Sequence, residues 1–254
     1  MPRKISGYGW IPDLPDQRDH LYAAVPQVLA TLPVSADLTD QCPLVYDQGQ
    51  LGSCTANSIS AAIEFDRLRQ KMPDFMPSRL FIYYNERARE GTVGTDSGAQ
   101  IRDGIKSVAE QGVCPESEWP YDISKFTQKP SDKCYLEALL DRAVSYQRLI
   151  QNLNQMKGCL ASGFPFVFGF TVYESFESQE VAQTGHASVP GPSEQAIGGH
   201  AVMAVGYDDA HQWFIVRNSW GQSWGMKGYF TLPYTYLLQP NLASDFWTIR
   251  LVGS

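Results

Sequence analysis

Helical and strand patterns occupy different parts of this chain, which restricts the folds that it can adopt. Apolar residues recur at helical spacing in 54–71 and again in 99–111, ahead of a break at Gly163-Phe164-Pro165. After that break, Phe166 to Tyr173 forms a continuous apolar run that is typical of a buried strand. Helices first and strands later predict an α+β fold, with a helical lobe followed by an antiparallel, β-barrel-like lobe.

The expected elements follow from this periodicity and from residues that start or end helices. Pro77-Ser78 is a helix start, and Gly112 follows the last residue of another helix. We expect helices at 54–71, 79–90, 99–111, 133–149 and 152–162, and strands at 166–173, 228–232 and 245–252. Residues 174–198 are polar and poor in regular signal, which predicts a cleft-side loop, a lid or a surface excursion.

A glycine-bearing turn delivers a cysteine to the start of the first helix. Gln48 is followed six residues later by Cys54, with Gly49 and Gly52 between them. A thiol in the first helical turn lies at the positive end of the helix dipole and near free backbone N–H groups, which favours the thiolate. Because the thiolate is the nucleophilic form, Cys54 is a candidate catalytic residue. The alternative is a buried structural cysteine.

Two apolar runs near the C-terminus predict an antiparallel hairpin. Residues 198–207 and 212–221 are rich in β-branched and aromatic side chains and flank a short polar turn. With the turn centred on Asp209, His200 and Asn218 stand nine residues to either side, so they lie opposite each other on one face. This pairing depends on the strand register. It provides a base, His200, and a polar group that holds its tautomer and ring orientation.

Taken together, these pieces resemble the papain-like cysteine peptidases of the C1 type. The matching pieces stand in the family's order: Gln48, Gly52-Ser53-Cys54, Gly199-His200-Ala201 and Asn218-Ser219-Trp220-Gly221. Asp96-Ser97-Gly98 is similar to the family's glycine-bearing edge of the substrate cleft, and Glu118-Trp119-Pro120-Tyr121 to its Tyr-Pro-Tyr segment. The resemblance runs from about residue 43 to the C-terminus. Each piece alone is a weak signal, whereas four in order with suitable spacing are specific.

The resemblance implies a Cys-His-Asn mechanism for peptide-bond hydrolysis. Cys54 would attack the carbonyl carbon to form a thioester acyl-enzyme, and His200 would take the thiol proton and return it to the leaving amine. Asn218 would orient His200. Gln48 would donate a side-chain hydrogen bond to the developing oxyanion, together with the backbone N–H of Cys54.

The same resemblance places further residues around the substrate. Gly98 would offer backbone hydrogen bonds to an extended peptide, with Ser97 and Gly199 beside the cleft. Trp220 would cover the contact between the histidine and the asparagine and keep water off it. Gly199 stands where many relatives have Asp or Asn, so the pH response of the catalytic pair would differ. Gly169 falls near the family's main specificity pocket, which predicts an open pocket.

Residues 1–40 form a proline-rich extension ahead of the peptidase domain. We place that domain at 41–254, with the helical lobe at about 41–150 and the β lobe at about 151–254. Papain-like zymogens usually carry a longer, helical pro-segment, and this extension is too short and too rich in proline to be that domain. Two interpretations stay open: an arm packed against the body, or an abbreviated pro-segment that lies over the cleft and inhibits the enzyme intramolecularly.

The number and spacing of the cysteines bear on disulfide formation and on the redox compartment of the protein. The four cysteines besides Cys54 permit three full pairings or none: Cys42, Cys114, Cys134 and Cys159. Many relatives pair a cysteine three residues before the nucleophile, where this chain has Leu51. The broken disulfide pattern favours a reducing compartment and, with the short extension, a bacterial rather than a lysosomal relative.

Charge and composition bear on the partners. The net charge of −7 argues against nucleic acid or an anionic membrane as the main partner, so we expect a peptide or protein substrate. No apolar run reaches membrane-spanning length and no signal peptide is visible, so we expect a protein that is intracellular, mature, or exported by a route that the sequence does not show. Without a Cys-x-x-Cys pair, and with four scattered histidines, the sequence predicts no metal and no cofactor.

A thiol peptidase is the leading interpretation, and two alternatives remain. An acyltransferase or deamidase would form the same acyl-enzyme, and only the acceptor, water or an amine, would differ. The third is an inactive peptide-binding module, against which the intact set of Gln48, Cys54, His200 and Asn218 argues.

Overall fold

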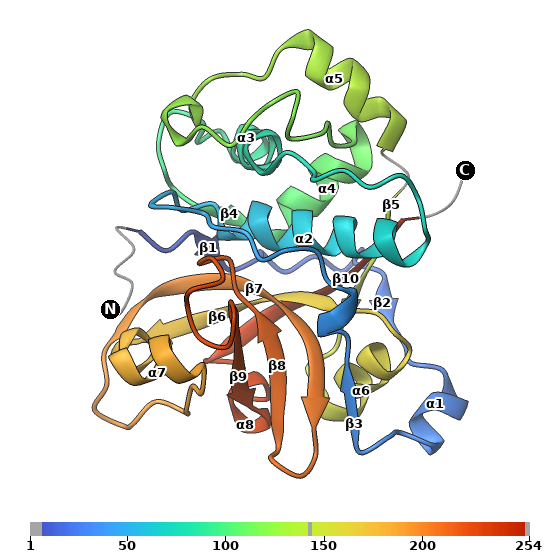
Figure 1. Ribbon diagram of the computed structural model, residues 1–254, viewed down its shortest axis with the longest axis vertical. Coiled ribbons are helices and arrows are strands. Elements are labelled where there is room, and N and C mark those ends of the chain that lie inside the picture. The colour runs from blue at the N-terminus through green and yellow to red at the C-terminus, as the bar shows by residue number, and fades with distance from the viewer. Residues whose placement is uncertain (1–6, 142–143, 252–254) are drawn as a thin grey trace.

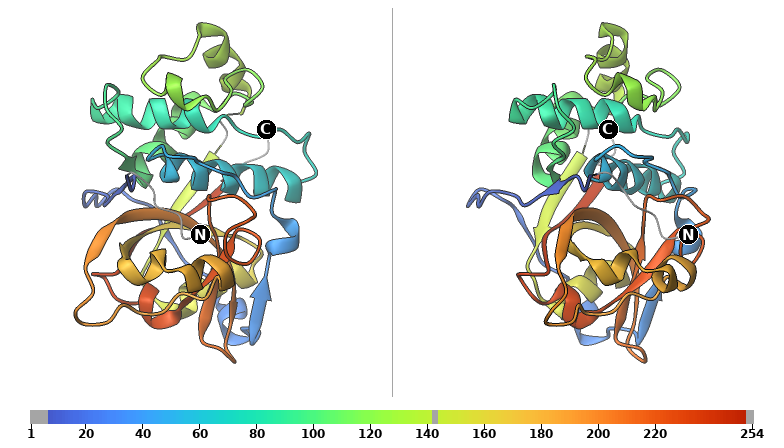
Figure 2. Two further views of the ribbon diagram at one scale, coloured as in Figure 1. Left: turned by 60° about the vertical axis from the view of Figure 1, so that its left-hand side comes forward. Right: turned by 90° about the vertical axis from the view of Figure 1, so that its left-hand side faces the viewer.

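The structure, a computed structural model, describes residues 7–141 and 144–251. Figure 1 shows a helical layer above a β layer, with helix α2 (Cys54–Arg69) between them. Figure 2 shows the same two layers from the side, with the N-terminal segment running along the boundary between them. The predicted α+β fold with a helical lobe and a β lobe is confirmed.

Helices of the helical lobe begin and end at local cap signals. The Ser78 hydroxyl accepts a backbone N–H at the start of α3 (Arg79–Glu90), and Gly91 ends that helix in the left-handed region, at φ 73°. Two further helices, α4 (Ile101–Gln111) and α5 (Asp132–Ala138), complete this lobe. The helices expected at 54–71, 79–90 and 99–111 are thus confirmed to within two residues at each end.

An eight-stranded sheet forms the β lobe. Its strands follow the order β2-β5-β10-β6-β7-β8-β9, and β3 pairs with β7. The strands are β2 (Leu21–Tyr22), β3 (Ser35–Asp37), β5 (Val144–Leu149), β6 (Phe166–Tyr173), β7 (Ala196–Asp208), β8 (Trp213–Arg217), β9 (Tyr229–Pro233) and β10 (Ala243–Leu251). Around them lie α1 (Pro26–Ala30), α6 (Leu153–Ala161), α7 (Gln179–Thr184) and α8 (Tyr234–Leu237), as Figure 1 shows. Neighbouring strands are antiparallel except β2 and β5.

Helix α2 is the core element that joins the lobes. Fourteen of its sixteen residues are buried, polar ones included, because it packs on the sheet below and on α3 and α4 above. Its polar side chains find internal partners: the Thr55 hydroxyl donates to Glu86 and the Ser60 hydroxyl to the Pro77 carbonyl. A residue at the start of this helix is therefore held rigidly.

The structure overturns two of the expected elements. The helix predicted over 133–149 ends at Ala138, and β5 takes up Val144–Leu149, where backbone pairing with β10 outweighs the helical pattern. The 174–198 stretch, expected to be irregular, contains a 3₁₀ turn at Glu174–Glu177 and the helix α7, which begins at the cap residue Ser178.

The predicted hairpin forms with a different register. Met203 pairs with Arg217, whereas a turn centred on Asp209 would have paired it with Ile215. The shift is three residues beside the turn, where Asp208 pairs with Trp213, and a bulge between Ala204 and Gly206 reduces it to two at Met203. Because the shift is two residues on the side of the bulge that leads to His200 and Asn218, the side chains there keep the predicted face of the sheet, and a one-residue shift would have reversed them.

The N-terminal extension is packed on the body along its described length. We call residues 7–19 the arm. Its strand β1 (Trp10–Ile11) pairs in parallel with β4 (Ala99–Gln100) of the helical lobe. The rest of the extension contributes β2, α1 and β3 to the β lobe. Among the described residues, no helix combines the length and the apolar character needed to cross a membrane.

Candidate active site

Backbone contacts join the turn that precedes α2 to the segment that follows strand β8. The Gln48 backbone N–H donates to the Ser219 carbonyl at 2.9 Å, and Asp47 forms a β-bridge with Trp220. The turn itself reverses at Gly49, whose φ of 63° suits glycine. These contacts hold Cys54, the first residue of α2, against the β lobe.

The Cys54 thiol is fully buried, with 0% of the residue exposed. This burial raises the pKa of Cys54 to about 12, and it outweighs backbone hydrogen bonds from Ala201, Gly9 and Thr55 that favour the thiolate. Burial therefore opposes the ionisation that the position of Cys54 at the start of α2 favours. The Gly9 backbone N–H contacts the sulfur, so the arm is part of what surrounds the buried thiol.

His200 and Asn218 are in direct contact. His200 Nε2 lies 2.8 Å from Asn218 Oδ1, and the Ser219 backbone N–H donates to the same oxygen at 2.8 Å. The Trp220 ring stacks on the His200 ring, with centroids 5.0 Å apart and planes inclined by 28°. Because Asn218 Oδ1 accepts, Nε2 of His200 carries the hydrogen and Nδ1 is the basic nitrogen.

The Gln48 side chain is buried with its amide orientation fixed. Its Oε1 accepts the Ser219 hydroxyl at 2.6 Å, and its Nε2 donates to the Leu51 carbonyl at 3.0 Å. The Tyr121 hydroxyl donates to the Gln48 carbonyl at 2.9 Å and lies 2.5 Å from Ser53 Oγ. Gln48 is therefore held from both lobes, beside the first turn of α2.

Sequence reasoning missed the side chains that hold this constellation. Ser219 and Tyr121 fix Gln48, and Asp96 accepts the Gly52 backbone N–H at 3.1 Å. Asp96 also accepts the Tyr83 hydroxyl, so it joins α3 to the turn before the nucleophile. Ser219 and Tyr121 lie inside the motifs that carried the resemblance, which was the signal available for them. Nothing in the sequence pattern pairs Asp96 with Gly52, because the two are far apart in the chain.

Comparison with known proteins decides the family. A model of the papain family cysteine proteases matches residues 32–236. The chain belongs to this family. A crystal structure of xylellain, a cysteine protease from Xylella fastidiosa, superposes with a TM-score of 0.92 and 48% identity, over 99% of this chain and 98% of the other. The predicted kinship with a bacterial member is confirmed.

Two curated relatives agree with this assignment. An uncharacterized peptidase C1-like protein of Acanthamoeba polyphaga mimivirus is 44% identical over 270 residues, which cover 96% of this chain and 87% of that protein. A cathepsin B-like protein, CP3, of Giardia intestinalis is 30% identical over 229 residues, covering 83% of this chain and 73% of that protein. The chain is a cysteine-type peptidase, a hydrolase that acts on peptides or proteins, and the acyltransferase and binding-module alternatives are not favoured.

In this papain-family peptidase, the loop predicted to bind substrate faces the arm. The Gly98 N–H donates to the Tyr83 hydroxyl at 3.2 Å, and its carbonyl accepts the Ser97 hydroxyl at 3.0 Å. Both backbone groups of Gly98 are thus engaged within the helical lobe. The hydrogen bond to the extended chain comes instead from the next residue, since the Ala99 N–H donates to the Gly9 carbonyl at 2.8 Å.

Glycines on both sides of the cleft allow the arm to approach closely. A Cβ atom added to Gly9 would lie 1.6 Å from the Gly52 carbonyl oxygen, in the turn before the nucleophile. A Cβ atom added to Gly199 would lie 2.7 Å from Trp10, so an Asp or Asn here would collide with the arm. The Tyr8 ring lies edge-on to His200, with centroids 6.1 Å apart. The arm therefore fills the cleft from the nucleophile to the histidine.

Beyond the cleft, the arm is fastened by buried and partly buried charged residues, which we call the anchor network: Asp13, Asp19, Arg102, Arg148 and Asp245. The Asp13 backbone N–H donates to Asp245 Oδ2 at 2.8 Å, and Asp13 Oδ1 accepts the Arg102 backbone N–H at 3.0 Å. Asp19 pairs with Arg102 at 2.5 Å and with Arg148 at 3.1 Å. Arg148 in turn pairs with Asp245 at 2.8 Å. The network joins the arm to both lobes.

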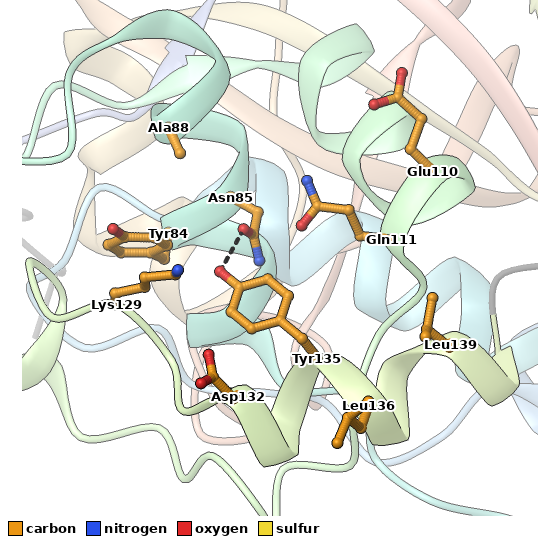
Figure 3. Close-up of a pocket in the computed structure, with 10 residues that line it drawn as sticks. All are labelled: Tyr84, Asn85, Ala88, Glu110, Gln111, Lys129, Asp132, Tyr135, Leu136 and Leu139. Carbon is orange, nitrogen blue, oxygen red and sulfur yellow. Dashed lines mark hydrogen bonds between the residues drawn. The ribbon is translucent and has the colours of Figure 1, made fainter.

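A separate hollow of about 790 Å³ lies on the helical lobe between α3, α4 and α5 (Figure 3). Its lining includes Tyr84, Lys129 and Leu136, and the Tyr135 hydroxyl donates to Asn85 Oδ1 at 2.9 Å across it. None of the residues predicted to bind or cleave substrate lines this hollow. It is therefore distinct from the peptidase cleft.

Proposed function

We propose that Cys54, His200 and Asn218 hydrolyse peptide bonds, and that the arm inhibits this site until it is displaced. The observation that carries the catalytic part is the contact between His200 Nε2 and Asn218 Oδ1 at 2.8 Å. It leaves His200 Nδ1 as the base that takes the thiol proton. The thiolate then attacks the substrate carbonyl carbon, and the resulting thioester is hydrolysed by water.

We assign the oxyanion contacts to Gln48 and to the backbone N–H of Cys54. One hydrogen of Gln48 Nε2 is donated to Leu51, which leaves the other for a substrate oxygen. Cys54 is the first residue of α2, where backbone N–H groups have no partner within the helix. Loss of one such donor typically lowers kcat by about 10²–10³-fold. Trp220, stacked on His200, keeps water from the histidine–asparagine contact.

The placement of the arm supports inhibition without self-cleavage. The Gly9 backbone N–H faces the Cys54 sulfur and the Gly9 carbonyl points to Ala99, so the group presented to the nucleophile is an amide hydrogen rather than a carbonyl carbon. Cys54 and His200 are both 0% exposed beneath the arm. The closed form therefore excludes substrate, and activity reports the fraction of molecules in which the arm has left the cleft.

The test displaces the arm in the full-length protein by a single methyl group. Gly9→Ala places a Cβ atom where the Gly52 carbonyl stands, whereas the same change at Gly7 meets nothing within 4 Å. Overpacking of this kind costs about 1–3 kcal/mol, which corresponds to a roughly 5- to 150-fold larger open fraction. We therefore expect Gly9→Ala to raise both hydrolysis of a fluorogenic peptide and labelling of Cys54 by an epoxide inhibitor, while Gly7→Ala matches wild type.

Two outcomes separate the two parts of this proposal. Equal rates and equal labelling in wild type, Gly7→Ala and Gly9→Ala would remove the inhibitory role of the arm. Retained hydrolysis or labelling in the Gly9→Ala protein after a further Cys54→Ala change would remove the catalytic assignment. Product analysis with and without an added amine distinguishes hydrolysis from acyl transfer.

A further inference from the structure

We propose that the pocket filled by the Trp10 indole selects tryptophan side chains in substrates, with Asp245 as the group that accepts the indole N–H. This inference rests on the proposed function, because it takes the arm and the substrate to use one cleft. On this basis, the Trp10 side chain of the arm indicates which substrate side chain the pocket binds.

Two glycines, Gly169 and Gly199, form walls of this pocket, and both lie close to His200 in the sheet. A Cβ atom added to Gly169 would lie 1.9 Å from Trp10 Cε2, and one added to Gly199 would lie 2.7 Å from Trp10 Cε3. Gly199 directly precedes His200, and Gly169 pairs with Ala201 in the sheet. A planar double ring thus rests against bare backbone, one residue away from the catalytic histidine. Trp10 thus lies against Gly169, the residue from which an open pocket is predicted.

The floor of the pocket is a carboxylate placed to accept a hydrogen bond. Asp245 is 2% exposed, and its Oδ2 accepts the Trp10 indole N–H at 3.2 Å and the Asp13 backbone N–H at 2.8 Å. Its other oxygen accepts Arg148 at 2.8 Å. Asp245 has a φ of 58°, at a register shift in β10, which turns its carboxylate towards the pocket instead of into the regular ladder.

When the arm leaves, the Asp245 carboxylate at the floor of the pocket loses hydrogen-bond donors. Asp245 Oδ2 loses both the Trp10 and the Asp13 donors, while Oδ1 keeps Arg148 and the carboxylate keeps the Ser244 side chain. A buried acceptor without a donor is unfavourable, so a substrate side chain that carries an N–H at the right depth is favoured over one that does not. Phenylalanine fills the ring space and leaves the acceptor unmet, whereas tryptophan restores the contact seen with Trp10.

The charges around the floor argue against a cationic side chain. If residues 7–13 leave, Asp245 and Asp19 remain beside Arg102 and Arg148, which balances the charge. If Asp19 leaves as well, two arginines face a single carboxylate. In neither case is the pocket net negative, so an arginine or lysine of the substrate would meet Arg148 without a free counter-charge. A neutral donor meets no such repulsion.

The first experiment measures binding, so that it does not depend on catalysis. Full-length protein carrying Cys54→Ala and Gly9→Ala is titrated calorimetrically with acetyl-Tyr-Gly-X-Ile-Pro-amide, the arm's residues 8–12 with X varied. X is tryptophan, naphthylalanine, phenylalanine or arginine. Naphthylalanine keeps the two rings and lacks the N–H. We expect tryptophan to bind about tenfold more tightly than naphthylalanine, as for a hydrogen bond to a charged group.

The matched protein variant is Asp245→Asn, which preserves shape and tolerates a positive φ. Its amide oxygen is held by Arg148, which turns the NH₂ group towards the indole, so the tryptophan advantage should shrink to about twofold or less. Equal binding of tryptophan and naphthylalanine to the parent protein, or tighter binding of arginine, overturns the inference. Should Asp245→Asn fail to fold, the peptide series alone still decides the question.

A second experiment tests whether peptides with tryptophan are preferred as substrates. Gly9→Ala protein is incubated with a pool of peptides randomised on the acyl side of one bond, and the products are read by mass spectrometry. Enrichment of tryptophan at one position, lost in Asp245→Asn, supports the inference. Cleavage without tryptophan enrichment overturns it while leaving the peptidase assignment intact. If no peptide is cleaved, the proposed catalytic role fails, and the binding series still decides the pocket.

Discussion

The two parts of the arm meet the body in different ways. In the cleft, Tyr8 to Trp10 rely on shape: backbone lies against glycine, and rings lie against His200 and Gly169. Outside the cleft, Asp19 relies on charge, through Arg102 and Arg148 of the two lobes, and Asp13 accepts the Arg102 backbone N–H. The first part contacts Cys54 and His200, and the second ties the arm to both lobes. Because different residues make the two sets of contacts, covering of the cleft and retention of the arm on the body can be changed independently.

Removing a buried arginine should have the largest effect on retention. Arg102 and its partner Asp19 have side chains only 6% and 7% exposed. Arg102→Ala leaves Asp19 with Arg148 alone, and breaking a buried pair in this way costs about 3 kcal/mol or more of unfolding free energy. Urea denaturation measures this loss. The control, Arg89→Ala, breaks more exposed pairs with Asp103 and Glu110 and should cost less than about 1 kcal/mol.

Equal, small losses in the two arginine variants would show that the anchor network contributes little to stability. A large loss in Arg102→Ala with unchanged labelling of Cys54 would show that the network stabilises the body without retaining the arm.

Opening the cleft should restore the acidity of the nucleophile. Burial raises the pKa of Cys54 to about 12 from an ordinary value of 9.0, and the Gly9→Ala change admits water to the sulfur. We expect the midpoint of iodoacetamide alkylation of Cys54, followed against pH by mass spectrometry, to fall towards the ordinary value. Gly7→Ala is the control and should keep the wild-type profile. An unchanged midpoint in Gly9→Ala would mean that elements other than the arm bury the thiol.

Retention of the arm should weaken as pH rises. Burial, and after it the neighbouring Asp245 carboxylate, raise the pKa of Asp13 to about 6 from an ordinary 3.8. The docked arm thus binds this proton more tightly than the free arm, so docking is strongest below pH 4 and is lost progressively as pH rises to 6. The open fraction should grow by up to about tenfold per pH unit in that window.

Hydrogen exchange of the Ala99 amide, which donates to the Gly9 carbonyl, reports this opening once corrected for the intrinsic rate. Asp13→Asn should remove the pH dependence. Burial also raises the pKa of Glu90, to about 7. The parallel variant Glu90→Gln therefore measures how much Glu90 contributes to the pH dependence of opening. A pH-independent opening in wild type would contradict the role of Asp13.

The smallest effect is expected from a single hydroxyl in the cleft. The Tyr8 hydroxyl donates to the Glu177 carboxylate, which flanks the cleft just after β6. Tyr8→Phe keeps the ring against His200 and removes this one hydrogen bond, so the open fraction should rise by about fivefold. The rate of Ala99 exchange measures it. Tyr84→Phe, in the hollow on the helical lobe, is the matched control and should leave exchange unchanged.

Local sequence determined the elements that carry the chemistry. The glycine turn between Gln48 and Cys54 predicted a helix start at Cys54, and α2 begins there. The two apolar runs at 198–221 predicted the hairpin that brings His200 and Asn218 together, although the register differs by two residues. Such features depend on residues close in the chain, where spacing and cap preferences act directly.

Only the tertiary structure decided the state of the site. Val144–Leu149 became a strand because β10 lies beside it, and burial opposes the predicted ionisation of Cys54. Asp245 meets Trp10 from the opposite end of the chain. Burial, charge balance and strand pairing depend on which distant segments come together, and no local pattern encodes that. The sequence alone therefore predicted the contact between His200 and Asn218, and the packing of distant segments decided that Gly9 of the arm lies against Cys54.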